Sequence, residues 1–155
     1  MARHTISATA VIDSPAETAY AVIADYWDGH PHILPRPPFV SLDVDEGGVG
    51  AGTVIRFRMK MLGSTREMRA AITEPEPGRV LVERDAAGDV VTTFTVEPAE
   101  GGKARVTIAT DMKVPGGPVG WLQKRLITRL LHPVYVREIE QLGRVASEWA
   151  KGGRR

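Results

Sequence analysis

Three side chains in this sequence are candidates for chemistry on a bound molecule: Tyr26, His30 and Arg66. An imidazole exchanges protons near neutral pH, a phenol donates a hydrogen bond, and a guanidinium stabilises negative charge on an oxygen. Together they could polarise a carbonyl group or move a proton. Arg66 alternates in phase with Met68, which predicts that it faces the apolar side of a strand. In the alternative, it reaches water from a strand end beside Gly63.

Asp28, His30 and His32 are close enough in the sequence to suggest a metal site. However, Pro31 and Pro35 place them in irregular backbone, and no second group of ligands stands nearby. We therefore predict no metal. We expect these residues either to shape the mouth of a cavity or to cap the edge of a sheet.

Several signatures of enzymes are missing from the sequence. It contains no cysteine, which excludes disulfides, thiolate nucleophiles and cysteine-based metal sites. It also lacks a glycine-rich phosphate loop, a G-x-S-x-G turn and an H-E-x-x-H helix. Glu83 and Asp85 stand near a turn and are interpreted as solvated charges, and no two carboxylates have the spacing of an acid/base pair. No cofactor is predicted.

All four methionines after the initiator take inward positions on predicted strands: Met59, Met61, Met68 and Met112. Flexible, polarizable side chains suit a cavity that adapts to a bulky or variable ligand. They also fill gaps in a dry core, which is the alternative.

The elements that position these residues begin with a strand and a short helix. Apolar and polar residues alternate from residue 3 to residue 12, which indicates a half-buried strand. Ser14 is predicted to cap a helix over residues 16–25, with Pro15 in its first position and Glu17 completing a capping box. The prolines between residues 31 and 38 allow at most a second short helical piece.

Residues 39–112 form a succession of strand-length runs separated by turn residues. Spacings of ten to sixteen residues predict about six antiparallel strands, or seven with the first strand. The turns are Gly47-Gly48, Gly63-Ser64, Pro77-Gly78, Ala87-Gly88 and Gly101-Gly102. Between residues 53 and 61, apolar side chains oppose Arg56, Arg58 and Lys60, so we expect one apolar face and one wet face.

After Pro118 the apolar residues recur with the period of a helix, from Val119 through Leu122 to Trp149. About thirty residues of helix, ended by Gly152, reach about 45 Å at 1.5 Å per residue. Pro133 lies inside this segment and predicts a kink or a local break. Seven strands must curl to cover a single helix, and we expect the space between sheet and helix to be a cavity.

Six stretches of the sequence carry a resemblance to a known family: IDSPAET (12–18), DY (25–26), HPHILP (30–35), GGVGAGT (47–53), EPGR (76–79) and TTFTV (92–96). They resemble the START-related, birch-pollen-allergen-like (SRPBCC) superfamily, and within it the bacterial polyketide cyclase/dehydrase-like proteins. The resemblance covers nearly the whole chain. It implies one α+β helix-grip domain, residues 1–155, that binds a hydrophobic ligand. It implies a reaction less specifically, because members include carriers, sensors and a minority of cyclases.

The leading hypothesis is a protein that binds a hydrophobic small molecule, such as a lipid, a quinone or a polyketide, between sheet and helix. The predicted ligand-binding residues are Ile55, Phe57, Met59, Met61, Met68, Phe94, Thr110, Met112, Leu122, Leu126 and Leu130. One alternative is a cofactor-independent aromatase/cyclase or dehydrase in the same cavity, using Arg66, Tyr26 or His30. Another is an interaction module with a closed cavity that docks a protein partner.

The charge balance argues against two classes of partner. Twenty Lys and Arg against nineteen Asp and Glu give a formal net charge of +1, so no strong overall field attracts nucleic acid or anionic lipid. The N-terminus lacks the apolar run of a signal peptide, and no eighteen consecutive apolar residues occur. We therefore predict a cytoplasmic protein with no nucleic-acid partner and no stable membrane insertion.

Overall fold

The computed structural model describes residues 2–152 and contains seven strands and two α-helices. Strand β1 (Ala2–Ile12) is followed by helix α1 (Ala16–Ala24) and the single 3-10 turn η1 (His30–His32). Six strands come next: β2 (Phe39–Glu46), β3 (Val54–Met61), β4 (Ser64–Glu76), β5 (Val80–Asp85), β6 (Val90–Ala99) and β7 (Lys103–Val114). The last element is the long helix α2 (Gly117–Gly152).

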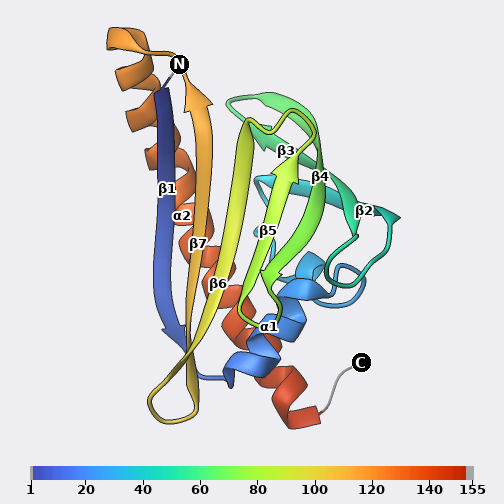
Figure 1. Ribbon diagram of the computed structural model, residues 1–155. Coiled ribbons are helices and arrows are strands. Elements are labelled where there is room, and N and C mark those ends of the chain that lie inside the picture. Colours follow the sequence, from blue (N-terminus) through green and yellow to red (C-terminus); the bar gives the residue numbers. More distant parts are fainter. Residues whose placement is uncertain (1, 153–155) are drawn as a thin grey trace.

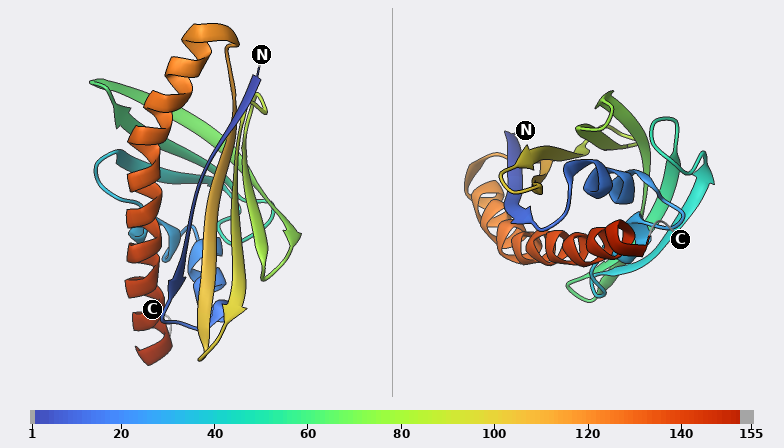
Figure 2. Two further views of the ribbon diagram at one scale, coloured as in Figure 1. Left: turned by 90° about the vertical axis from the view of Figure 1, so that its left-hand side faces the viewer. Right: turned by 90° about the horizontal axis from the view of Figure 1, so that it is seen from below.

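All seven strands form one antiparallel sheet in the order β1-β7-β6-β5-β4-β3-β2. The sheet curls around α2, and α1 packs across one end of the space between them (Figures 1 and 2). This arrangement confirms the predicted α+β helix-grip fold. Each of the five predicted turns falls where two consecutive strands are connected, and Ser64 of the second turn is also the first residue of β4. No helix within residues 2–152 has the length and apolarity that crossing a bilayer requires.

The start of α1 differs from the sequence-based prediction. Pro15, not Ser14, is the N-cap residue, and no side chain bonds the first amides of the helix. The Ser14 hydroxyl is instead buried, without a hydrogen-bond partner in the described part of the chain, while Glu17 is exposed. The predicted capping box is therefore wrong, because the serine side chain turns toward the interior rather than toward the helix.

Helix α2 runs for 36 residues and continues through Pro133, so the local break allowed by the sequence does not occur. Its predicted apolar stripe begins too early, because Val119 and Leu122 are 66% and 62% exposed. They belong to the first turns of α2, and this end of the helix projects past the end of the sheet (Figure 1). Apart from Gly120, the buried residues of α2 begin at Leu131.

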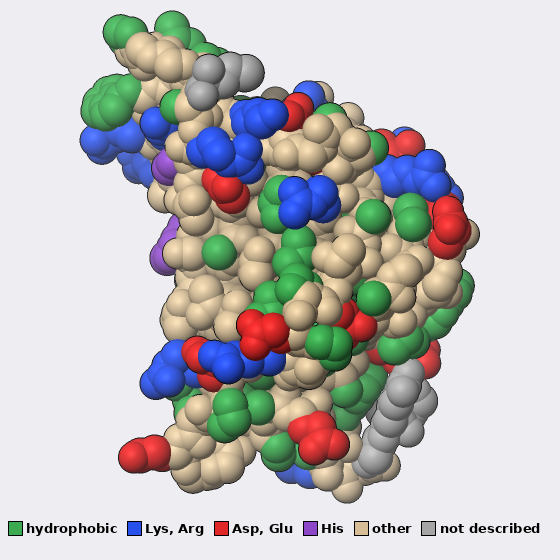
Figure 3. Space-filling model, viewed as in Figure 1, with side chains coloured by type: hydrophobic (Ala, Val, Ile, Leu, Met, Phe, Trp, Pro, Cys, Tyr) green, Lys and Arg blue, Asp and Glu red, His purple; other side chains and the backbone are tan. Residues whose placement is uncertain are grey.

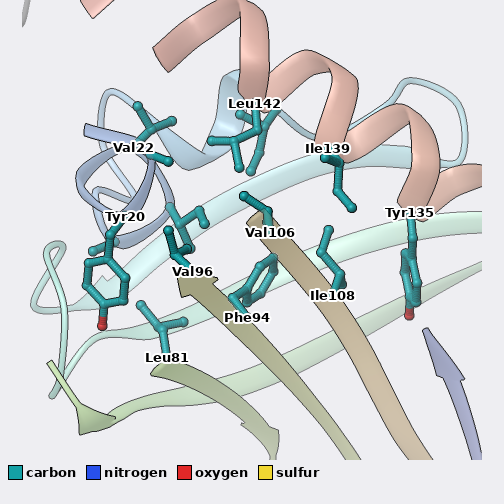
Figure 4. Close-up of a cluster of buried hydrophobic side chains, with 14 of the residues drawn as sticks. Tyr20, Val22, Leu81, Phe94, Val96, Val106, Ile108, Tyr135, Ile139 and Leu142 are labelled. Atoms are coloured by element: carbon teal, nitrogen blue, oxygen red, sulfur yellow. The ribbon is translucent and has the colours of Figure 1, made fainter. Parts of the chain in front are cut away.

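The solid part of the core lies where α1, α2 and the sheet meet. Leu142 and Ile139 of α2 point toward Val106 and Phe94 of the sheet (Figure 4). These side chains are almost completely buried. Burial of this kind stabilises the fold by roughly 1.5–3 kcal/mol for each large apolar side chain. The tight packing at this end leaves the open space nearer the other end of α2.

Candidate functional site

A cavity of about 370 Å³ lies between the inner face of the sheet and α2. Its volume falls in the range of roughly 300–1,000 Å³ that is usual for small-molecule sites. Its wall on α2 extends from Leu126 to Glu138, a separation that corresponds to about 18 Å at 1.5 Å per residue. Leu126 is 46% exposed and Glu138 is 2% exposed, so the cavity has an open mouth near Leu126 and a buried inner end near Glu138.

Most of the cavity wall is apolar. Ten of the eleven predicted ligand-binding residues border it: Ile55, Phe57, Met59, Met61, Met68, Phe94, Thr110, Met112, Leu126 and Leu130. Leu122 does not border the cavity, and its side chain is exposed. The four methionines thus face an open space rather than a filled core, and the cavity is not closed as the interaction-module alternative assumed.

Arg66 lies at the mouth of the cavity. It borders the cavity but is exposed, and it pairs across the sheet with Met59 near the start of β4. The position of Arg66 therefore combines the two predicted alternatives, because its side chain has access both to the cavity and to water. It does not join Tyr26 and His30, which are both buried.

Tyr26 and His30 come together at the inner end, beside a residue that was interpreted as a solvated charge. The Tyr26 hydroxyl donates a 2.6 Å hydrogen bond to Oε2 of Glu83, and Nε2 of His30 lies 3.5 Å from the same oxygen. The two rings stack with centroids 4.4 Å apart. Glu83 and His30 border the cavity, whereas Tyr26 stands behind them. The interpretation of Glu83 as a solvated surface charge is therefore wrong.

The backbone around this cluster is held by the glycine-rich loop before β3. The amide of Tyr26 donates to the Gly48 carbonyl at 2.8 Å, and the amide of Gly50 donates to the Ala24 carbonyl at 2.9 Å. A Cβ atom at Gly48 would lie 1.8 Å from Nε1 of Trp27, and its φ of 143° is unfavourable for other residues. Glycine is therefore required for the loop to approach this segment.

The hydrogen bonds of His30 define which of its two ring nitrogens faces Glu83. Nδ1 lies 2.8 Å from the Ile23 carbonyl oxygen. A carbonyl oxygen only accepts, so Nδ1 carries the proton in the neutral ring. Nε2, next to Glu83, is then the nitrogen that can exchange a proton.

Glu138 is a second carboxyl group at the inner end. It is 2% exposed, borders the cavity, and makes no hydrogen bond to another described residue. Burial raises the pKa of the Glu138 carboxyl well above its usual value, and repulsion from Glu83 raises it further. This rise favours the protonated acid, which can donate a hydrogen bond into the cavity.

A chain of hydroxyl groups forms a smaller polar strip on the cavity wall. Thr92 and Thr110 of neighbouring strands are hydrogen-bonded at 2.8 Å, and Thr110 is also bonded to the Tyr135 hydroxyl of α2. All three residues border the cavity. Burial raises the pKa of Tyr135, so its hydroxyl remains protonated. The strip ties the helix to the sheet through groups that satisfy one another.

Asp28 and His32 do not join His30. Both are exposed, whereas His30 is turned inward toward Glu83. Among residues 2–152 no group of three or more His, Cys, Asp or Glu side chains is arranged to hold a metal ion.

Sequence reasoning missed Glu83, Glu138 and Tyr135, although two of them left a signal. Glu83 shares its phase in β5 with Leu81, which pairs with the predicted cavity residue Phe94. Glu138 stands in the buried stripe of α2, four residues before Leu142. An acidic residue in an apolar stripe is unusual enough to mark a functional candidate.

Comparisons with known proteins agree with this fold. The family model described as "Polyketide cyclase / dehydrase and lipid transport" matches residues 3–147. Among solved structures, the KanY protein superposes with a TM-score of 0.82 at 26% sequence identity, covering 95% of this chain and 99% of that one. The Zhui aromatase/cyclase from Streptomyces sp. R1128 gives a TM-score of 0.78 at 17% identity, covering 99% and 100%.

A START superfamily protein from Mycobacterium smegmatis has the same fold, with a TM-score of 0.70 at 17% identity over 94% of this chain and 99% of that one. No curated protein sequence matched. The family match and the apolar cavity confirm the prediction of a helix-grip protein that binds a hydrophobic small molecule. The chain belongs to the family described as "Polyketide cyclase / dehydrase and lipid transport".

Proposed function

We propose that the cavity holds a hydrophobic molecule whose inner end carries a carbonyl or another hydrogen-bond-accepting oxygen. The observation that carries this proposal is Glu138, a buried carboxyl group that borders an apolar cavity and makes no hydrogen bond or ion pair with another residue of the described range 2–152. Its carboxyl group borders the cavity, so an oxygen acceptor on a ligand can form a hydrogen bond with it, which contributes roughly 0.5–1.5 kcal/mol.

The apolar wall supplies most of the affinity in this proposal. Burial of about 300 Å² of apolar ligand surface contributes about 7 kcal/mol at 25 cal/mol per Å², before the entropic cost of association. The methionines allow the wall to adapt to ligand shape. Shape and hydrophobicity then set the general affinity, and Glu138 sets the orientation.

The test compares two competitors that displace a hydrophobic fluorophore: a polycyclic ketone and the hydrocarbon of the same skeleton. We expect the wild-type protein to bind the ketone about ten-fold more tightly, as one hydrogen bond predicts. Glu138→Leu should abolish this preference, and Glu138→Gln, which keeps a donor, should retain part of it. Glu140→Gln, on the exposed side of the same helix, is the matched control. Equal binding of ketone and hydrocarbon by the wild-type protein would contradict the proposal.

A second candidate function is dehydration or cyclisation of a β-hydroxy or poly-β-ketone substrate. It is favoured by the presence of a base and an acid at one end of the cavity, His30 beside Glu83 and the raised-pKa Glu138. In a dehydration, Nε2 of His30 would take the proton α to the carbonyl. Glu138 would protonate the departing hydroxyl, which leaves as water.

Turnover of a poly-β-ketone analogue distinguishes catalysis from binding. We expect His30→Gln or Glu138→Gln to lower kcat by roughly 10²–10⁴-fold while the fluorophore still binds. Arg66→Ala and Tyr26→Phe test the predicted roles of the other two candidates. Binding of the analogue without any product, in the wild-type protein, would exclude this second function for that substrate.

A further inference from the structure

The projecting start of α2 exposes an unusual set of apolar side chains. Trp121 is 59% exposed, Leu122 62% and Val119 66%. Hydrophobic side chains gather over these turns at the upper left of Figure 3, next to Lys and Arg side chains. We call the surface formed by Val119, Trp121, Leu122, Leu126, Arg125 and Arg129 the α2 tip.

The charge of the first part of α2 differs from the charge of the rest of the chain. Residues 117–137 contain four Lys and Arg and no Asp or Glu, which leaves 16 basic and 19 acidic residues elsewhere. Arg125 and Arg129 are exposed, and the guanidinium of Arg125 lies 5.2 Å from the centre of the Trp121 ring. A local positive field is therefore present on a protein with almost no net charge.

The α2 tip is continuous with the mouth of the cavity. Leu126 belongs to the tip and also borders the cavity. Leu62, in the turn between β3 and β4, borders the cavity as well and is 74% exposed. An apolar molecule could therefore pass from a surface in contact with the tip into the cavity with little exposure to water.

We propose that the α2 tip docks the protein on a membrane that contains anionic phospholipid, with the cavity mouth facing the bilayer. Tryptophan and leucine flanked by arginine are the combination that binds the membrane interface. Each arginine near an anionic surface adds attraction, which high salt screens. A symmetric dimer through the same face would bring like charges together. Nucleic acid offers little to exposed Val, Leu and Trp in a helix.

The experiment is co-sedimentation of the full-length protein with two kinds of vesicle, pure phosphatidylcholine and an equimolar mixture with phosphatidylglycerol. We expect binding to the mixed vesicles, weakened by salt, and a blue shift of tryptophan emission that is lost in Trp121→Phe. Arg125→Gln with Arg129→Gln should weaken binding at least about ten-fold. Trp121→Ala with Leu122→Ala should weaken it about ten-fold or more.

Matched controls lie on the second half of the same helix. Arg144→Gln and Val136→Ala alter an exposed charge and an exposed apolar residue away from the tip, and we expect vesicle binding to be unchanged. Fluorophore displacement in solution should be normal in all these variants, which shows that they fold. Failure to bind mixed vesicles would overturn the proposal. So would binding that ignores the tip substitutions, self-association through Leu122, or stronger binding to duplex DNA than to vesicles.

Discussion

At the scale of single residues, the buried Glu138 carboxyl makes stability depend on pH. Its pKa is raised in the folded protein, so the native state holds a proton that the unfolded state releases above the ordinary glutamate range. Wild-type stability should therefore fall relative to Glu138→Gln as pH rises above the ordinary glutamate pKa of 4.5, by up to about 1.4 kcal/mol per pH unit. Urea unfolding at several pH values measures this difference.

Glu140→Gln provides the control for this prediction. Glu140 is exposed on the same helix, so its substitution should leave the slope of stability against pH unchanged. A constant difference in unfolding free energy between Glu138→Gln and the wild-type protein over the whole pH range would show that Glu138 is not the titrating group.

A comparison of Tyr26 with Tyr20 separates a tyrosine's contribution to stability from its contribution to ligand binding in the cavity. Tyr26 and Tyr20 each donate a 2.6 Å hydrogen bond to a glutamate, Glu83 and Glu74 respectively. We expect Tyr26→Phe and Tyr20→Phe to lower the unfolding free energy by about 1.5–3 kcal/mol each, as loss of a bond to a charged group predicts. Only Tyr26→Phe should change the affinity for a hydrophobic ketone, because only Glu83 borders the cavity. Equal effects of both substitutions on affinity would contradict this assignment.

Single residues were also the scale at which the sequence was least informative. Alternation placed the four methionines and Phe57 correctly, because their neighbours on β3, β4 and β7 follow a regular period. It failed for Glu83, whose strand β5 has apolar residues in both phases, Leu81 and Val82, so that no single inward phase could be chosen. The charge of Glu83 also led to the wrong assignment. An acidic residue is usually solvated, and the sequence does not show which partners lie opposite it in the fold.

At the scale of elements, the hydroxyl strip couples α2 to the sheet. Tyr135→Phe and Thr110→Val each remove one end of the Thr110–Tyr135 hydrogen bond, and each should cost about 1 kcal/mol of unfolding free energy. Because both substitutions remove the same bond, the double variant should cost less than the sum of the single ones. Urea unfolding of the four proteins measures the coupling. Strict additivity would mean that the bond contributes nothing to holding the helix.

The elements themselves were predictable to different degrees. The strands were found because turn dipeptides and period-two alternation are local signals, and all five turns are where they were expected. The start of α1 was not, since the orientation of Ser14 depends on what surrounds it in the fold. The exposure of Val119 and Leu122 also depends on where the sheet ends, which helical periodicity does not encode.

At the scale of the whole molecule, a ligand that fills the cavity should stabilise the fold. A saturating ligand at about a hundred times its Kd adds about 2.7 kcal/mol, which raises Tm by roughly 5–10 °C for a domain of this size. Met112→Trp, which places a large ring in the cavity, should abolish the shift. Val11→Trp adds the same ring on the exposed side of β1 and should preserve it. Thermal scans with and without a bound ketone are the measurement.

The overall architecture could be predicted because it follows from the number of strands and helices and from their order along the chain. Seven strands and one long apolar helix leave few ways to bury both, and the curled sheet is the compact solution. An open cavity was expected between the curled sheet and the helix, but a solid core stayed open as an alternative, because the same methionines would fill one equally well. The polar inner end of the cavity depends on contacts between residues more than fifty positions apart, such as Tyr26 with Glu83.

The cavity has an open mouth and a buried inner end, and this shape also determines how it distinguishes related ligands. If the oxygen-bearing head always seats against Glu138, every member of a homologous series starts from the same point. Each added carbon then moves only the tail toward Leu62 and Arg66, where it leaves the pocket. The protein would therefore discriminate by chain length. It would enclose short members of the series completely and bind long ones with their tails exposed to solvent.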